Sequence, residues 1–199
     1  MPTLSHVHPT LIAILWPARR TASFLRLFVL IAIGSALLTI SAKIQVPFWP
    51  VPLTMQTFVV LVIGMAYGWR LGAVTVLVYL AEGAFGLPVF AGTPEKGIGL
   101  AYMMGPTGGY LVGFVIAAAA VGWLAEREWD RHPISTAVAM VIGNLLIYLL
   151  GVAWLTSLIG AEKAFKFGLA PFLAGDALKI LLATAILPIS WRLMRRIGR

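Results

Sequence analysis

The stretch that decides the fold is Ile134–Leu158, ISTAVAMVIGNLLIYLLGVAWLTSL, which contains no charged side chain. A helix rises about 1.5 Å per residue, so this stretch can cross the roughly 30 Å hydrocarbon core of a bilayer. Its apolar residues run continuously and do not alternate with polar ones, as they would in an outer-membrane β-barrel. The stretch therefore predicts a transmembrane α-helix.

The composition of the whole chain agrees with this prediction. Of its 199 residues, 60% are apolar and 11% are charged, and the mean hydropathy is +0.95. Average soluble domains are about 45–50% apolar and about 25% charged, and disordered chains are poorer still in apolar residues. Both classes are excluded. The absence of cysteine excludes disulfides, Cys-ligated metals and thiol catalysis.

On both sides of this stretch, further apolar runs and their boundaries predict an all-α membrane protein with six transmembrane helices. Residues 1–23 are expected to form an N-terminal arm, interfacial or loosely ordered, and residues 24–199 a single domain. Pro188 is expected to kink the last helix near its end. The predicted spans are Phe24–Ala42, Leu53–Gly68, Leu71–Ala84, Gly108–Ala125, Ile134–Leu158 and Phe172–Leu193.

Positive charges predict the orientation. The net charge is +8, with no nucleic-acid-binding motif, so the basic residues are interpreted as topology signals. Ten arginines fall on the side of the two termini, whereas the other side has four basic residues, Lys43, Lys96, Lys163 and Lys166. Cytoplasmic loops are enriched in Lys and Arg, so both termini are predicted to be cytoplasmic.

Charged residues inside a membrane span are costly and mark functional sites by default. Three lie in the outer half of the predicted spans: Glu82, Asp176 and Lys179. The last two are three residues apart and share a helix face. Uncharged polar residues occur at similar depth, namely Gln56, Tyr79, Tyr110, Asn144 and Tyr148. A channel would show polar groups at every depth, so the distribution predicts a binding pocket that opens outward.

Simpler interpretations remain open for these residues. Asp176 and Lys179 can form a purely structural ion pair, Glu82 can lie at the interface, and Asn144 can bond between helices. The small residues Ala32 and Ala36 permit close helix approach. No nucleotide, metal or catalytic motif is present, so we expect a protein that is not an enzyme and has no cofactor.

Several motifs, in order, resemble the BioY family, the biotin-binding S components of energy-coupling-factor (ECF) transporters. The resemblance covers roughly residues 24–195. The motifs are Pro50-Val-Pro-Leu-Thr-Met-Gln-Thr57, Tyr79-Leu-Ala-Glu-Gly83, Gly86-Leu-Pro-Val-Phe-Ala-Gly92, Gly105-Pro-Thr-Gly-Gly-Tyr-Leu111 and Pro171-Phe-Leu-Ala-Gly-Asp-Ala-Leu-Lys179.

The resemblance implies an S-component-like bundle in the bacterial inner membrane, with the loop Lys43–Pro52 helping to cover an outward-facing vitamin site. It implies capture of biotin outside and delivery to the cytoplasm, together with a transmembrane coupling protein and two ATPase subunits. Ala32 and Ala36 would contact the coupling protein. The first alternative is a self-sufficient transporter, coupled to protons through Glu82 or Asp176 or else facilitative. The second is an S component for another vitamin.

Biotin offers a ureido group with two N–H donors and one carbonyl, an apolar bicycle and a carboxylate tail. A matching site needs acceptors, a donor, apolar walls and a cation. We expect Asp176, with Lys179 assisting, at the ureido group, although the reversed ligand orientation is nearly as favourable. Other candidate contacts are the polar Gln56, Asn144, Tyr148 and Glu82 and the aromatic Trp49, Tyr79, Phe90 and Tyr110.

Overall fold

The computed structural model describes residues 8–17 and 23–197, most of which lie in α-helices. Two short strands pair antiparallel, with Gln45 opposite Thr54. Within the described residues the elements are α1 (Leu11–Leu15), α2 (Ser23–Lys43), β1 (Gln45–Val46), β2 (Leu53–Thr54), α3 (Gln56–Tyr67), α4 (Trp69–Ala84), α5 (Gly99–Met103), α6 (Gly108–Ala125), α7 (Pro133–Ile159), α8 (Ala161–Gly168) and α9 (Ala170–Ile197).

Four helical stretches in the described part of the chain are long and apolar enough to cross a membrane. They are α2, α6, α7 and the stretch Ala161–Met194, which includes α8 and most of α9. This confirms a helical membrane protein. Because α3 has 12 residues and α4 has 16, both are shorter than the roughly 20 residues of a full span. The count of six spans remains a prediction.

The predicted boundaries differ from the observed ones where short local structures intervene. The second helix begins at Gln56 and not at Leu53, because Leu53 and Thr54 form β2. Gly68 makes the predicted turn between α3 and α4 with φ of +84°, a conformation that favours glycine. The short helix α5 lies inside the segment Phe85–Thr107, which is rich in glycine and proline. Helix α9 continues through Pro188 to Ile197.

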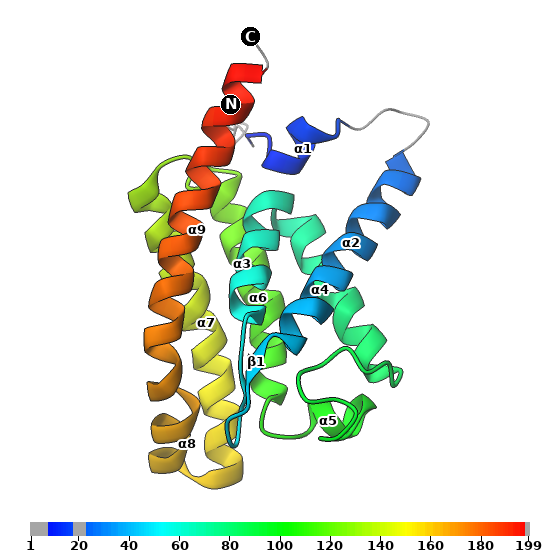
Figure 1. Cartoon of the computed structure of the whole chain (residues 1–199), viewed down its shortest axis with the longest axis vertical. Coiled ribbons are helices and arrows are strands. Elements are labelled where there is room, and N and C mark those ends of the chain that lie inside the picture. Colours follow the sequence, from blue (N-terminus) through cyan, green and yellow to red (C-terminus); the bar gives the residue numbers. More distant parts are fainter. Residues whose placement is uncertain (1–7, 18–22, 198–199) are drawn as a thin grey trace, which may run out of the picture.

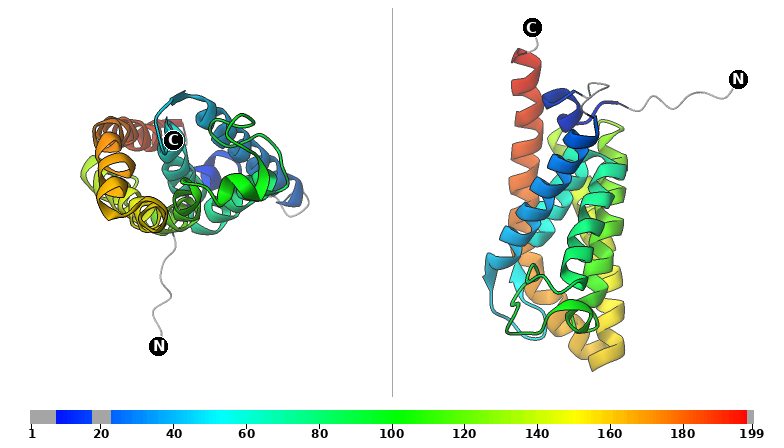
Figure 2. Two further views of the ribbon diagram at one scale, coloured as in Figure 1. Left: turned by 90° about the horizontal axis from the view of Figure 1, so that it is seen from below. Right: turned by 90° about the vertical axis from the view of Figure 1, so that its right-hand side faces the viewer.

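The helices form an elongated bundle with distinct ends (Figures 1 and 2). The helices α3 and α6 lie centrally, with α7 and α9 on one side and α2 and α4 on the other. The short helix α1 and the C-terminal end of α9 lie at one end of the bundle. The strands, α5 and α8 gather at the opposite end, which we call the loop end.

Close approach to the central helix α6 requires glycine. A Cβ atom on Gly113 of α6 would lie 2.9 Å from the Cα atom of Ile147 in α7. On the other side, a Cβ atom on Gly64 of α3 would lie 2.6 Å from the carbonyl oxygen of Ala118 in α6. Small residues let membrane helices approach in this way, and the resulting contacts hold α3 and α7 against α6.

The described part of the predicted arm packs on the bundle. Leu11 of α1 is buried, and the His8 amide donates to Glu126 O at 3.0 Å. The Arg26 guanidinium in α2 donates to Ile12 O at 3.2 Å. Residues 8–17 therefore contact the bundle, while residues 1–7 and 18–22 of the predicted arm lie outside the described residues.

Candidate functional site

A hydrogen-bonded cluster around Asp176 joins three helices near the loop end. The Asp176 residue is only 3% exposed. Its Oδ2 atom accepts a hydrogen bond from the Tyr148 hydroxyl of α7. Its Oδ1 atom accepts from the Thr57 hydroxyl of α3 at 3.1 Å and from the Lys179 ammonium at 2.7 Å. Both carboxylate oxygens are therefore satisfied.

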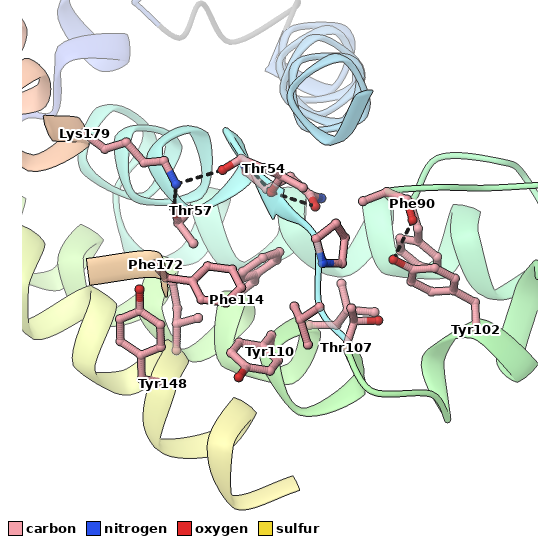
Figure 3. Close-up of a pocket in the computed structure, with 16 residues that line it drawn as sticks. Thr54, Thr57, Phe90, Tyr102, Thr107, Tyr110, Phe114, Tyr148, Phe172 and Lys179 are labelled. Carbon is pink, nitrogen blue, oxygen red and sulfur yellow. Dashed lines mark hydrogen bonds between the residues drawn. The ribbon is translucent and has the colours of Figure 1, made fainter. Parts of the chain in front are cut away.

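The Lys179 ammonium, one turn further along α9, is bound equally well. Its Nζ atom lies 2.7 Å from Asp176 Oδ1. It also lies 2.9 Å from Thr57 Oγ1 and 2.8 Å from Thr54 O (Figure 3). Three acceptors match the three N–H donors of a lysine. A buried ion pair is stable only when further hydrogen bonds compensate for its desolvation, and this pair has them. The pair ties α9 to α3 and to the strand β2.

A narrow cavity of about 40 Å³ adjoins the cluster. It has room for a few water molecules. Lys179, Thr57 and Tyr148 reach its wall at one end, whereas Asp176 lies behind them. The rest of the wall is largely apolar and aromatic, with side chains from α3, α6, α7, α9, the α4–α5 loop and the β1–β2 loop, among them Val51, Phe90, Tyr102, Tyr110, Phe114 and Phe172 (Figure 3).

Aromatic side chains build two sides of this cavity. The Phe90 ring stacks on Tyr102 at a centroid distance of 5.0 Å and meets the edge of Tyr79 at 5.4 Å. Across the cavity, Tyr110 stacks on Phe172 at 6.4 Å. Offset-stacked and edge-on pairs are the favourable aromatic arrangements, so the walls hold their shape.

Polar atoms of these walls are bound within the protein. The Gln56 amide donates to the Tyr79 hydroxyl at 2.7 Å, and that hydroxyl donates to Val89 O at 3.1 Å. The Tyr110 hydroxyl donates to Gly168 O at 2.7 Å. These bonds connect α3, α4 and α6 to the loops that surround the cavity.

The predicted site residues divide into three groups: those that line the cavity, those that support it from behind and those that lie outside it. Five line the cavity, namely Gln56, Phe90, Tyr110, Tyr148 and Lys179. Two others support it from behind: Tyr79 holds Phe90 and Gln56, and Asp176 holds Tyr148 and Lys179. Five of the 16 lining residues were therefore among the predicted ones, as were Tyr148, Asp176 and Lys179 of the cluster. Their contact with a ligand stays a prediction.

The remaining predicted residues lie outside the cavity. Glu82 accepts a hydrogen bond from the Ser35 hydroxyl of α2, between α2 and α4. Trp49 is 66% exposed, and its ring meets the edge of Phe167 in α8 at 6.0 Å. Ala32 and Ala36 are exposed on α2. Asn144 faces α9 from α7.

Asn144 lies at a second hollow, a groove of about 890 Å³ between α7 and α9. Apolar side chains form most of its lining. Its polar residues include Asn144, Tyr148 and Asp176. Tyr148 thus lines both hollows, and its hydrogen bond to Asp176 lies at the wall between the cavity and the groove.

Several lining residues were not predicted. Thr57 is the last residue of the motif Pro50–Thr57 and follows Gln56 directly. Its hydroxyl lies at the same membrane depth as the predicted polar residues, and this could have marked it as a site residue. Tyr102 belongs to α5, within a segment rich in glycine and proline. Lys96 lines an adjoining hollow of about 80 Å³ that shares Pro52, Tyr102 and Thr107 with the main cavity.

Comparison with protein families now identifies the chain. The BioY family model matches residues 14–196. The chain belongs to the BioY family.

Individual relatives agree with this membership. This BioY-family chain is 40% identical over 158 residues to the "Probable biotin transporter BioY" of Pyrococcus horikoshii, covering 79% of this chain and 90% of that protein. It is 38% identical over 156 residues to the "Biotin transporter BioY" of Thermotoga maritima, covering 77% and 89%.

A solved structure shares the fold. The crystal structure of the "S-component for biotin from an ECF-type ABC transporter" matches with a TM-score of 0.73 and 23% identity. The match covers 88% of this chain and 95% of that one. The predicted likeness to an S-component bundle is therefore confirmed at the level of the fold.

Proposed function

We propose that this BioY-family chain is the biotin-binding S component of an ECF-type vitamin transporter. The observation that carries the proposal is the buried Asp176–Lys179 pair at one end of an otherwise largely apolar, aromatic cavity. The names of the BioY relatives and the fold of the biotin S component support the choice of ligand.

The chemistry of the cavity suits the ureido end of biotin. The Tyr148 hydroxyl reaches the wall and can donate to the ureido carbonyl, and so can the Lys179 ammonium when it exchanges one of its three present acceptors for the ligand. The Asp176 carboxylate supplies the acceptor for a ureido N–H once the Tyr148 hydroxyl turns aside from Oδ2. Charge-assisted hydrogen bonds of this kind are roughly twice as strong as neutral ones. Biotin needs more room than the cavity of about 40 Å³ offers, so its binding requires the walls to move apart, with Phe90 and Tyr110 then enclosing the bicycle.

The carboxylate tail of biotin needs a second cation because Lys179 is already paired. The hollow lined by Lys96 adjoins the main cavity at Tyr102 and Thr107. We assign the tail to this hollow, where the Lys96 ammonium neutralises the carboxylate. The ligand then lies with its ureido ring toward α9 and its tail toward α5.

The membrane arrangement follows from the charges and the ends of the bundle. Arg127 and Arg131 lie at the end that carries α1, whereas Lys163 and Lys166 lie on α8 at the loop end. Cytoplasmic loops are rich in Lys and Arg. We therefore assign six spans in a bacterial inner membrane, with both termini cytoplasmic and the cavity outside.

Transport requires partners in this proposal. Ala32 and Ala36 are exposed on α2 and leave a shallow surface against which another helix can pack. We assign this surface to the transmembrane coupling protein, which works with two ATPase subunits. The chain itself then binds and reorients and performs no chemical step.

Isothermal titration of biotin into the detergent-purified, ligand-stripped protein tests the proposal, with thiamine and riboflavin titrated in parallel. The expected result is tight one-to-one binding of biotin and no heat from the other two vitamins. A protein that melts cooperatively but binds no biotin contradicts the proposal.

A further inference from the structure

Three consecutive carbonyl groups in the wall of the cavity are each bound by a different helix. They belong to residues 89–91, in the loop between α4 and α5. The Tyr79 hydroxyl donates to the first at 3.1 Å, the Lys43 ammonium to the second at 3.0 Å and the Tyr102 hydroxyl to the third at 2.8 Å. Two of the three residues, Phe90 and Ala91, line the cavity.

Lys43 is the donor from the most distant part of the chain. It is the last residue of α2, and its Nζ atom also donates to Thr93 O and Thr93 Oγ1, each at 3.0 Å. All three N–H donors therefore have acceptors. Among the described residues no carboxylate lies within ion-pair distance of Lys43. The ammonium is used to hold this loop.

The loop that Lys43 holds fits tightly against α4. The Phe90 ring is 1% exposed and lies between Tyr79 and Tyr102. It also lies directly over Gly83, where any Cβ atom would collide with the ring. The Phe90 ring is packed too tightly to move independently of its backbone. A shift of the Phe90 backbone therefore moves the cavity wall.

The same end of α2 is connected to the other side of the cavity. The chain continues from Lys43 into β1, which pairs with β2. The carbonyl of Thr54 in β2 accepts the hydrogen bond from Lys179. The end of α2 thus connects through its side chain to the Phe90 wall and through its main chain to the Asp176–Lys179 pair.

We infer that Lys43 is a positioning residue that holds the Phe90 wall over bound ligand and so slows ligand release without contacting the ligand. The inference rests on the proposed biotin-binding function. It assigns to an exposed lysine of α2 a role in retaining bound biotin. It predicts that loss of this lysine changes the rate of biotin release and not the rate of biotin association.

Release and association of radiolabelled biotin by the full-length protein test this role. Lys43→Met should raise the release rate about tenfold, as expected for loss of a charge-assisted bond, and should leave association within about twofold of the control. The control is Lys163→Met in α8, which removes a lysine charge at the same end of the bundle. Within the described part of the chain, Lys163 has no side-chain hydrogen bond or ion pair. Lys43→Arg should restore slow release to within about threefold of wild type, because a guanidinium also donates to carbonyls.

Equal release rates in Lys43→Met and Lys163→Met would overturn the inference, as would a loss of affinity that comes entirely from slower association. If Lys43→Met does not fold, Thr93→Ala provides the test, because it removes one acceptor of the ammonium together with the 2.6 Å hydrogen bond that the Thr93 hydroxyl donates to Phe90 O. A release rate unchanged in Thr93→Ala would overturn the inference. Absence of biotin binding by the folded wild type would instead contradict the proposed function.

Discussion

Two buried aspartates, Asp176 near the loop end and Asp130 near the opposite end, have opposite surroundings. Asp176 is bound by Tyr148, Thr57 and Lys179 and forms an ion pair at 2.7 Å. Its charge is balanced by a cation that has further acceptors of its own. Such a carboxylate is held in one orientation, which suits it to recognise a ligand.

Asp130 has far less support. It lies in the loop between α6 and α7, is 0% exposed and accepts one hydrogen bond, from Trp191 Nε1 at 2.5 Å. Its Oδ1 atom is buried without a partner among the described residues. The neighbouring Arg131 pairs with Glu128 at 2.5 Å and stacks over the Trp191 ring. Burial therefore raises the pKa of Asp130 to about 6, against the opposing effects of Trp191 and Arg131.

The contrast shows that burial alone does not give an aspartate its role. Burying an unbalanced charge favours the protonated form of a carboxyl group. A dedicated cation with complete hydrogen bonding removes that effect. We interpret Asp176 as a ligand-recognition group and Asp130 as a structural group that fastens the C-terminal end of α9 through Trp191.

The largest expected effect separates the two aspartates by ligand affinity. Asp176→Asn should lower biotin affinity about 100-fold, because one charged acceptor and the correct placement of Lys179 are lost. Asp130→Asn should leave the affinity within about twofold of wild type. Isothermal titration of both variants checks this. A loss below tenfold in Asp176→Asn would contradict the assigned role.

The second prediction concerns stability within the pair. Lys179→Met should cost about 3 kcal/mol, because it leaves Asp176 buried without its cation. The double variant Asp176→Asn with Lys179→Met should be more stable than Lys179→Met alone. Apparent melting temperatures in one detergent at pH 7 provide the comparison. A double variant that melts below the single one would show that the pair is not coupled in this way.

The third prediction uses the raised pKa of Asp130. Between about pH 4 and pH 6 the folded protein retains a proton that the unfolded chain has released. The contribution of Asp130 to stability is therefore highest below pH 4 and falls as the pH rises through 6, by at most about 3 kcal/mol.

Melting curves from pH 4.5 to 7 test this pH dependence. Asp130→Asn should become progressively more stable than wild type as the pH rises, because its amide never ionises. All other titratable groups are the same in both proteins, so their effects cancel in the difference. A difference in melting temperature that is constant over this range would be inconsistent with a raised pKa.

The smallest effect is expected at Glu82. Its carboxylate contacts Ser35 between α2 and α4 and does not line the cavity. Glu82→Gln should therefore bind biotin within about twofold of wild type, and biotin uptake should remain independent of the proton gradient. Two results together would favour the self-sufficient transporter. Biotin uptake by the wild type would collapse with the proton gradient, and uptake by Glu82→Gln would no longer respond to that gradient.

The sequence predicts the depth of each residue in the membrane more reliably than the direction in which its side chain points. Depth follows from counting 1.5 Å per residue along a span, and Glu82, Asn144 and Asp176 were placed at similar depth. Direction depends on which helices pack together. Asp176 and Lys179 were placed correctly as a pair because residues three apart share a helix face by geometry alone. The position of Glu82 beside Ser35 depends on the packing of α2, which no single span reveals.

The loops were predicted less well for a related reason. The segment Phe85–Thr107 has the glycines and prolines of an irregular region, and yet Phe90 and Tyr102 from it form one wall of the cavity. Their positions depend on hydrogen bonds from Lys43 and Tyr79, which lie in other helices. Long-range contacts of this kind leave no periodic pattern in the sequence.

The most direct measurement is an experimental structure of the protein with biotin bound. The account predicts the ureido ring within hydrogen-bonding distance of Asp176 and Lys179, with Phe90 against the bicycle and the carboxylate near Lys96. Biotin bound in the groove between α7 and α9, or bound in the cavity with its carboxylate at Lys179, would contradict it.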